Sequence, residues 1–383
     1  MLKKILLGLF GFITVALMLA YVTGNSFLIT SVQRTYLAGE VTANINDHKV
    51  FSTRQIDAGS AQIWLKHEQY NTAPLSDSLT DHLERNNAIA YVVIKDGQLL
   101  AEHYFKGYDD RSKTNSFSMA KTVTSLLVGI AIEDGRIESF DQNLTDFLPE
   151  FNSYPLAAKA TLANLSLMNS GYEWTEDHYT PFSPTVELYY GSDGERFLLE
   201  GSFSAEPGSY WEYSSASTQL LAIALRRALR KSNPKQSLSG YLSEKLWQPL
   251  GMNDEALWHT DDQGTELAYC CLNTNARNYA KLGQLMLNLG QWNGKQLIPS
   301  SHINRMIQAD GQAYYGYSTW LSLNSKPNYY WFSGHLGQYI IVVPEHNVVI
   351  VKLGESRESI EANTTFREVE LPELIQETIK NLP

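Results

Sequence analysis

The stretch NSFSMAKTVTSLLVGIAIEDGRI, residues 115–137, places a serine and a lysine three positions apart at the head of a long apolar segment. Residues three apart lie on one face of an α-helix, so the Ser118 hydroxyl and the Lys121 amine point the same way. Two interpretations are open at this level. The pair is either a nucleophile beside its base, or a helix-capping serine followed by a lysine whose ammonium reaches solvent.

The residues that follow favour a buried helix. Apolar side chains between 123 and 131 occupy much of its circumference, and Asp134-Gly135 marks its end. A lysine at a helix N-terminus is disfavoured by the helix dipole, and a desolvated lysine has a lowered pKa, so that it can accept or relay a proton. The N–H of Ser118 would also point into the site, where an oxyanion could use it.

The Ser-x-x-Lys pattern is weak by itself, because chance matches are expected in a chain of 383 residues. The chain contains a second match, Ser232-Asn233-Pro234-Lys235. Pro234 argues against a continuing helical turn at that place. We therefore expect the chemistry at Ser118 and not at Ser232.

A nucleophilic serine needs partners, since a hydroxyl attacks poorly until a base removes its proton. In PGSYWEYSSAS (207–217), Tyr213 follows a Pro-Gly turn and precedes an apolar helix. In FSGHLGQY (332–339), His335 and Gly337 occupy a predicted turn between two strands. These two segments supply candidate partners for Ser118.

In this order the segments resemble the penicillin-recognising serine hydrolases. The likeness is to the class C β-lactamase-like superfamily, near the family VIII esterases and the 6-aminohexanoate-dimer hydrolases. LSLMNSGYEW (165–174), LNTNARNYAKLGQLMLN (272–288) and YGYSTWL (315–321) also fit that family. The resemblance spans about residues 80–355, and the ordered set is far more specific than any one motif.

The resemblance implies a role for each matching residue. Ser118 matches the acylated nucleophile, and Lys121 matches the amine that lowers its barrier. Tyr213 occupies the position of the tyrosine that carries protons to the leaving group and from the hydrolytic water. His335 stands where β-lactamases usually carry the lysine of Lys-Thr-Gly.

Two more site residues are implied in the same way. Gln338, directly after Gly337, matches the residue whose backbone N–H gives the second oxyanion contact. In WTEDHYTPFSP (174–184), Tyr179 matches the tyrosine that contacts the scissile amide in 6-aminohexanoate-dimer hydrolases. Glu176 and Asp177 beside it would then favour a cationic substrate end, whereas the alternative is an exposed acidic loop without a catalytic part.

The chain departs from the β-lactamase pattern at two places. Tyr213-Ser214-Ser215 replaces Tyr-Ala-Asn, so the asparagine that grips a β-lactam side chain is absent. His335 replaces a permanently charged lysine that helps to hold a substrate carboxylate. Both departures favour esters or amides that lack a β-lactam carboxylate.

The pattern of elements predicts an α+β fold of the β-lactamase/transpeptidase type. Residues 88–105 form a predicted hairpin, and 328–356 form three predicted strands with short turns, followed by a helix from about 366. Between them, residues 138–310 are mainly helical in pattern, with 217–231 and 276–290 as examples. We expect one antiparallel sheet from both chain ends, flanked by helices, with this helical region inserted.

The N-terminus predicts a membrane segment. Lys3 and Lys4 precede an uncharged apolar run at 5–22, intermediate between a signal-peptide core and a minimal spanning helix. We assign residues 1–24 to a signal peptide or membrane anchor, 25–75 to a lead-in segment and 76–383 to the hydrolase domain. The lysines place the start inside, so the rest is exported: anchored on the outer side of the inner membrane, or secreted after cleavage.

Composition excludes other classes. The net charge is −11 and the chain has no basic stripe, so nucleic-acid binding is not expected. The two cysteines, Cys270 and Cys271, are adjacent, and adjacent cysteines rarely bridge, so we expect small buried side chains and no disulfide framework. No metal-ligand spacing occurs among the histidines, so neither a metal nor a cofactor is expected.

We therefore predict a serine hydrolase that cleaves a small-molecule ester or amide through an acyl-enzyme on Ser118; its oligomeric state is left open. The alternatives are a D-alanyl peptidase or weak β-lactamase, and a non-catalytic module that binds a cell-wall fragment. Joint retention of Ser118, Lys121, Tyr213 and His335 favours an enzyme, because a pure binding module could have lost any of them.

Overall fold

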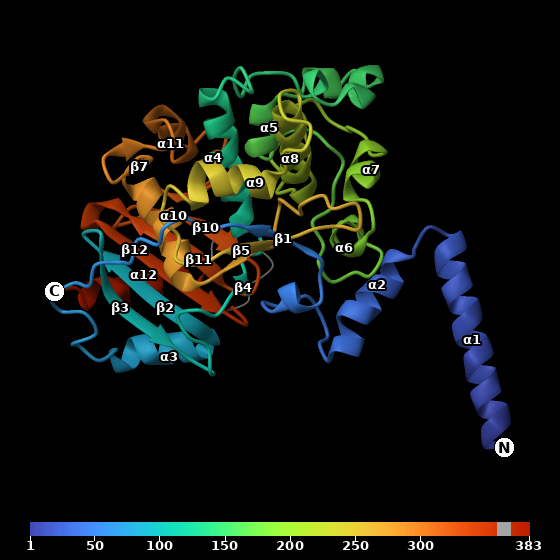
Figure 1. Cartoon of the computed structure of the whole chain (residues 1–383), viewed down its shortest axis with the longest axis horizontal. Coiled ribbons are helices and arrows are strands. Elements are labelled where there is room, and N and C mark those ends of the chain that lie inside the picture. Colours follow the sequence, from blue (N-terminus) through green and yellow to red (C-terminus); the bar gives the residue numbers. More distant parts are fainter. Residues whose placement is uncertain (358–368) are drawn as a thin grey trace.

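The computed structural model describes residues 1–357 and 369–383, and its largest sheet is built from both ends of the chain (Figure 1). This sheet has six antiparallel strands in the order β3-β2-β12-β11-β10-β9. The strands are β2 (Ala88–Lys95), β3 (Gln98–Tyr104), β9 (Trp320–Ser322), β10 (Tyr329–Gly334), β11 (Gln338–Val343) and β12 (Val348–Gly354). Since β2 pairs with β12, the predicted α+β fold is confirmed.

Helices cover both faces of the sheet, which explains why its strands are apolar on both sides. In β2, Val92 faces one hydrophobic core and Tyr91 faces the other. The covering helices are α10 (Ala276–Leu287) on the first face and α3 (Asp77–Arg85) and α12 (Glu370–Lys380) on the second. Gly283 lets α10 approach closely, because a Cβ there would lie 2.5 Å from a methyl carbon of Val349. The predicted start of the last helix near 366 lies outside the described residues.

The inserted region consists mostly of helices, as expected. Besides α10, its α-helices are α5 (Leu162–Ser166), α6 (Pro184–Tyr190), α7 (Gly194–Leu199), α8 (Ser215–Arg230), α9 (Leu238–Leu242) and α11 (Ser300–Met306); α4 (Met119–Glu133) comes directly before the region. α4 is buried over most of its length and contacts both α8 and β10. Its N-terminus therefore lies where the helical region meets the sheet.

A second, four-stranded sheet crosses the inserted region, which the sequence pattern did not predict. Its strands, in spatial order, are β1 (Thr53–Ile56), β5 (Ala256–His259), β6 (Leu272–Thr274) and β4 (Thr114–Asn115). These strands have two to four residues, and most of their side chains are buried. Segments this short and this buried show no alternation from which a strand could be predicted.

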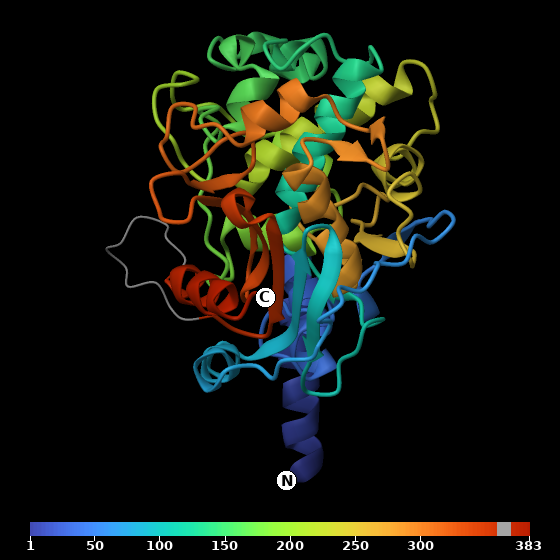
Figure 2. The same ribbon diagram turned by 90° about the vertical axis from the view of Figure 1, so that its left-hand side faces the viewer.

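The N-terminal part consists of a free helix and a segment that packs on the body. α1 (Leu2–Val22) has a mean hydropathy of 2.5 and buries none of its residues; it is the one helix in the described part of the chain with the length and composition to cross a membrane. Figure 1 and Figure 2 both show it projecting away from the body. After it, α2 (Phe27–Arg34) packs on α6, and Ile45, Phe51 and Trp64 enter the main core.

Candidate active site

Ser118 lies at the N-terminus of α4, at the end of a constrained turn. Phe117 before it has a φ of 44°, in the left-handed region that non-glycine residues rarely adopt, and its N–H donates to Asn115 Oδ1 at 2.9 Å. Ser118 occupies the N-cap position, yet its side chain accepts no hydrogen bond from the helix backbone. The capping interpretation of Ser118 is therefore wrong, and its hydroxyl is free to face Lys121.

Lys121 is buried, with only 1% of its surface exposed. Its Nζ lies 3.1 Å from Ser118 Oγ, 3.0 Å from Ser215 Oγ and 3.0 Å from the carbonyl oxygen of Tyr269. Burial lowers the Lys121 pKa to about 8, although the nearby Glu176 carboxylate acts to raise it. The alternative of an ammonium that reaches solvent is wrong, and a fraction of the amine is neutral near neutral pH.

Ser215 joins Lys121 to a carboxylate. Its hydroxyl donates to Glu176 Oε1 at 2.6 Å, and its N–H donates to Oε2 of the same group at 2.8 Å. Trp174 Nε1 also donates to Oε2, at 2.7 Å. In the sequence, position 215 stands out only as a missing asparagine; its place two residues after Tyr213 is the signal that could have pointed to a role for Ser215.

The position of Glu176 corrects an expectation. From the sequence, Glu176 and Asp177 beside a catalytic Tyr179 were expected to favour a cationic substrate end. In the structure the Glu176 side chain is only 14% exposed and is turned towards Ser215 and Trp174. The Asp177 carboxylate accepts the backbone N–H groups of Tyr179 and Thr180, so it holds the loop in shape.

Tyr213 lies just before α8, beside the Ser118–Lys121 pair. Lys121 Nζ is 5.0 Å from the centre of the Tyr213 ring. The ring also stacks on Trp320, at 5.5 Å between centroids, and meets Tyr315 edge-on at 6.4 Å. Because the aromatic neighbours fix the ring, Tyr213 is held next to the amine that the resemblance pairs it with.

His335 begins the turn between β10 and β11 and is half-buried. Its ring meets Phe117 edge-on at 5.5 Å, stacks on His178 at 5.4 Å, and lies 6.1 Å from the Tyr179 ring. Burial, and after it the neighbouring His178 and Arg357 side chains, lowers the His335 pKa to about 3. The imidazole is therefore neutral at neutral pH and offers no positive charge to a carboxylate.

Gln338 and Gly337 complete this turn. The Gln338 side-chain amide donates to the carbonyl oxygens of His335, Leu336 and Gly354, at 3.2, 3.1 and 2.6 Å. Gly337 has a φ of 79°, and a Cβ there would lie 2.5 Å from the Lys352 amine, so only glycine fits. These contacts fix the strand that carries the Gln338 backbone N–H, whose oxyanion role stays a prediction.

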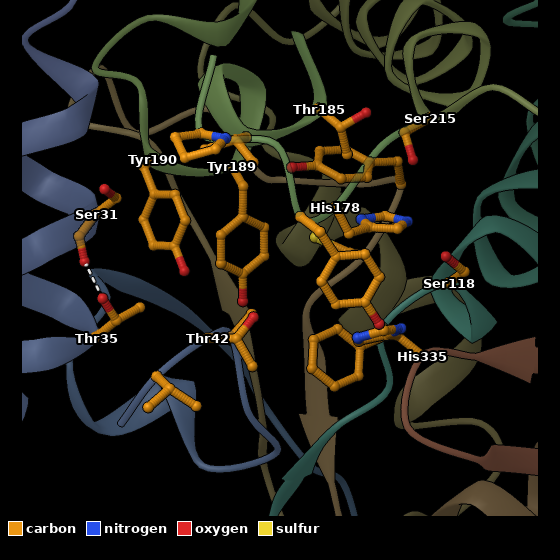
Figure 3. Close-up of a pocket in the computed structure, with 18 of the residues that line it drawn as sticks. Ser31, Thr35, Thr42, Ser118, His178, Thr185, Tyr189, Tyr190, Ser215 and His335 are labelled. Carbon is orange, nitrogen blue, oxygen red and sulfur yellow. Dashed lines mark hydrogen bonds between the residues drawn. The ribbon is translucent and has the colours of Figure 1, made fainter. Parts of the chain in front are cut away.

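A cavity of about 210 Å³ opens beside Ser118 (Figure 3). Ser118, Tyr179, Ser215 and His335 line one end of it, and α6 contributes its middle. Lys121 and Tyr213 are not among the residues that line it, although Lys121 Nζ lies 3.1 Å from Ser118 Oγ. Tyr179 is 74% exposed at the opening.

Comparisons with known proteins identify the family. The Beta-lactamase family model matches residues 77–367, about three quarters of the chain. The chain belongs to the beta-lactamase family.

Proteins similar to this beta-lactamase-family chain are named as hydrolases and esterases. A 6-aminohexanoate-dimer hydrolase of Paenarthrobacter ureafaciens is 25% identical over 300 residues, which cover 72% of this chain and 74% of that protein. A Bacillus anthracis structure provisionally named a 6-aminohexanoate-dimer hydrolase superposes with a TM-score of 0.71 at 24% identity, covering 87% of this chain and 91% of that one. A family VIII carboxylesterase gives a TM-score of 0.61 at 15% identity, with 84% and 99% covered. The protein is thus a beta-lactamase-family hydrolase, and the resemblance found in the sequence is confirmed.

The second Ser-x-x-Lys copy of this beta-lactamase-family protein lies away from the site. Ser232 follows the end of α8, and its hydroxyl donates to the carbonyl oxygen of Leu229 at 3.1 Å. The backbone N–H of Lys235 donates to Asn233 Oδ1 at 3.3 Å. The segment therefore forms a local turn, as expected because Pro234 prevents the helix from continuing.

The cysteines correct a second expectation. Cys270 and Cys271 are joined by a disulfide, with their Cα atoms 3.7 Å apart. Cys271 has a φ of 76°, and this turn of the backbone lets neighbouring sulfurs meet. Both residues are buried, as predicted, but the expectation that they do not bridge is wrong. Cys270 lines the cavity next to Tyr269, whose carbonyl oxygen binds Lys121.

The histidines at the site, His178 and His335, belong to the cavity wall. Within residues 1–357 and 369–383 there is no group of three or more His, Cys, Asp or Glu side chains that could hold a metal ion. His178, the histidine nearest to the site besides His335, lies 3.4 Å from Glu176 and stacks on His335. These imidazoles therefore act as parts of the cavity wall.

Proposed function

We propose that this protein is a serine hydrolase that cleaves an ester or amide through an acyl-enzyme on Ser118. The observation that carries the proposal is the buried Lys121 amine, 3.1 Å from Ser118 Oγ, whose pKa burial lowers to about 8. A lysine with its ordinary pKa would hold its proton at neutral pH and could not act as a base. A partly neutral amine at this distance can take the proton of the attacking hydroxyl.

In the first half-reaction, Ser118 Oγ attacks the carbonyl carbon while its proton passes to Lys121. The N–H groups of Ser118 and Gln338 receive the charge that forms on the carbonyl oxygen. The carbon–oxygen or carbon–nitrogen bond to the leaving group then breaks, and the Tyr213 hydroxyl gives that group its proton and takes the proton held by Lys121 in return. In the second half water attacks the acyl-enzyme and gives up a proton to Tyr213 and Lys121, which return it to Ser118 Oγ as the bond to the acyl group breaks.

Glu176 positions this machinery without touching the substrate. It accepts both the hydroxyl and the N–H of Ser215, which fixes Ser215 Oγ as an acceptor for Lys121. Since the carboxylate lies behind Ser215, it balances the lysine charge after proton transfer at a point that the substrate does not reach.

The substrate that the site suits best is neutral at the end facing His335. A neutral imidazole replaces the charged lysine there, and Ser215 binds Lys121 where an asparagine would reach a β-lactam side chain. The names of the relatives, a 6-aminohexanoate-dimer hydrolase and a family VIII carboxylesterase, support linear amides and esters as the class to test.

We further propose that α1 anchors the enzyme in a membrane. Lys3 and Lys4 at its start would remain inside, which places the hydrolase body on the periplasmic or extracellular side. Cleavage after the helix would release the same body as a secreted enzyme. The size and composition of α1 support either outcome.

The test of the catalytic proposal is labelling by a fluorophosphonate probe. The full chain, purified in detergent, should be labelled, and Ser118→Ala should remove the label. Ser232→Ala is the matched control, because it changes the serine of the other Ser-x-x-Lys copy, and it should leave labelling intact. Full labelling of Ser118→Ala would refute the nucleophile, whereas a folded wild type that takes no label would favour a binding module.

A further inference from the structure

The far wall of the cavity is made by the segment that follows α1. Ser31 and Thr35, from α2 and its end, line the cavity together with residues 41–43 of the lead-in. Figure 3 shows Ser31 and Thr35 across the cavity from Ser118 and His335, with Thr42 and, from α6, Tyr189 and Tyr190 between them. The cavity therefore runs from the nucleophile to the first elements after the apolar helix.

This wall lies close to any membrane that holds α1. The 21 residues of α1 span about 31 Å as a helix, close to the thickness of a bilayer core. Only residues 23–26 separate α1 from α2, and four residues reach at most about 14 Å. Because α2 packs on α6, this short connection holds the cavity near the bilayer surface whatever direction α1 takes.

The cavity itself is apolar and uncharged. None of the described residues that line it is Lys, Arg, Asp or Glu, and aromatic and aliphatic side chains form most of its surface. Its two histidines, His178 and His335, have pKa values lowered mainly by burial, and Arg357 near both lowers them further. Asp47 lies behind the wall, where it accepts the Tyr189 hydroxyl at 2.6 Å. Such a cavity suits a hydrocarbon chain better than a charged group.

The opening has an apolar rim. Tyr36, Val41 and Tyr179 line the cavity and are 63%, 78% and 74% exposed; Leu37 and Phe182 beside them are 77% and 68% exposed. These side chains come from both sides of the opening, the lead-in and the 174–184 loop. Large apolar groups gathered at one place mark a surface that binds an apolar partner, and aromatic residues are typical of the membrane interface.

From these observations we infer that the substrate is an amphiphile of the same membrane, an ester or amide of a medium- or long-chain fatty acyl group. Its chain enters between the lead-in and the 174–184 loop while the rim rests on the bilayer, and its carbonyl meets Ser118. This inference rests on the proposed function and adds the identity of the acyl group. Ser118 takes the acyl chain, and the polar alcohol or amine leaves with a proton. Water then releases the fatty acid from Ser118.

The test compares acyl groups on one leaving group. The full chain, reconstituted in phosphatidylcholine vesicles, is given fluorogenic acetyl and octanoyl esters, and we expect kcat/KM to be higher for the octanoyl ester by roughly tenfold or more. Thr42→Trp, which narrows the cavity between Ser118 and α2, should lower the octanoyl-to-acetyl ratio, and Val32→Trp on the exposed side of α2 should not. An enzyme that prefers the acetyl ester would overturn the inference.

The rim is tested with a fluorogenic long-chain ester embedded in the same vesicles. The double variant Leu37→Ser/Phe182→Ser should lower the rate on this ester, relative to the acetyl ester, several-fold. The matched control is Ile63→Ser/Leu65→Ser, which removes two apolar side chains of similar exposure, 78% and 72%, that do not line the cavity. Membrane docking would be refuted if the two double variants lowered the rate on the embedded ester equally. It would also be refuted if the mature chain lacked α1 and did not bind the vesicles.

Fluorophosphonate labelling in detergent separates a failure of the proposed serine hydrolase from a failure of the proposed membrane substrate. If Ser118 takes no label, the proposed function fails first. If Ser118 is labelled but the embedded ester is not hydrolysed, the serine hydrolase stands and the membrane substrate is refuted.

Discussion

Replacing Glu176 by glutamine should move the pH dependence of acylation to lower pH. Burial alone lowers the Lys121 pKa, and the Glu176 carboxylate opposes that effect, with a net value of about 8. Removing the negative charge while keeping the shape of the side chain leaves the burial effect unopposed. The amine of the variant should therefore lose its proton at a lower pH than that of the wild type.

The size of the change follows from the geometry. Lys121 Nζ lies 3.0 Å from Ser215 Oγ, and that atom lies 2.6 Å from Glu176 Oε1, so the two charges are within about 5.6 Å of each other. Coulomb's law then gives roughly 3 kcal/mol at an effective dielectric constant of about 20 and below 1 kcal/mol in bulk water. These limits correspond to a fall in the Lys121 pKa of roughly half a unit to two units.

The assay is the second-order rate of fluorophosphonate labelling, measured across pH in the full chain. For the wild type, the rate should rise with an apparent pKa near 8, and for Glu176→Gln the midpoint should lie lower. The plateau should also fall, because glutamine cannot accept both donors of Ser215. Glu173→Gln is the matched control: it makes the same chemical change in the same segment, where the carboxylate binds Ser202 instead.

Two results would refute the reasoning. An unchanged or raised midpoint in Glu176→Gln would mean that Lys121 is not the group whose proton controls acylation. An equal shift in Glu173→Gln would mean that the acidic segment acts through its general field and not through the Ser215 contact.

Three further predictions concern the pair and its neighbours. Lys121→Met should abolish labelling yet raise Tm. Burial lowers the lysine pKa from 10.5 to about 8, which costs the wild type up to about 3 kcal/mol of unfolding free energy below pH 8. The stability gained by the variant should shrink as the pH rises from 8 to 10.5, and a lower Tm would contradict this reasoning. Tyr213→Phe should reduce kcat for a short ester by roughly two orders of magnitude or more if the phenol transfers protons, and near-wild-type turnover would remove it from the mechanism. A chromogenic cephalosporin should be a poor substrate beside short acyl esters, since His335 is neutral, and efficient hydrolysis would favour the β-lactamase alternative.

Much of the fold could be predicted because its signals are local. The helix after Ser118, the hairpin at 88–105 and the three strands at 328–356 each carry their own apolar period, and the structure contains all of them. The strands β4, β5 and β6 could not be predicted, because two to four buried residues carry no period. The disulfide was missed because a bridge between neighbours depends on the backbone turn at Cys271.

By itself, the sequence determined the family and the order of its motifs, because Ser118, Lys121, Tyr213 and His335 can be read along the chain. Only the tertiary structure decided how charge is arranged around them. The inward Glu176, its link through Ser215 to Lys121, and the neutral His335 all depend on burial and on contacts between distant segments. Spacing along a chain does not report desolvation, and desolvation is what sets the protonation of a lysine or a histidine.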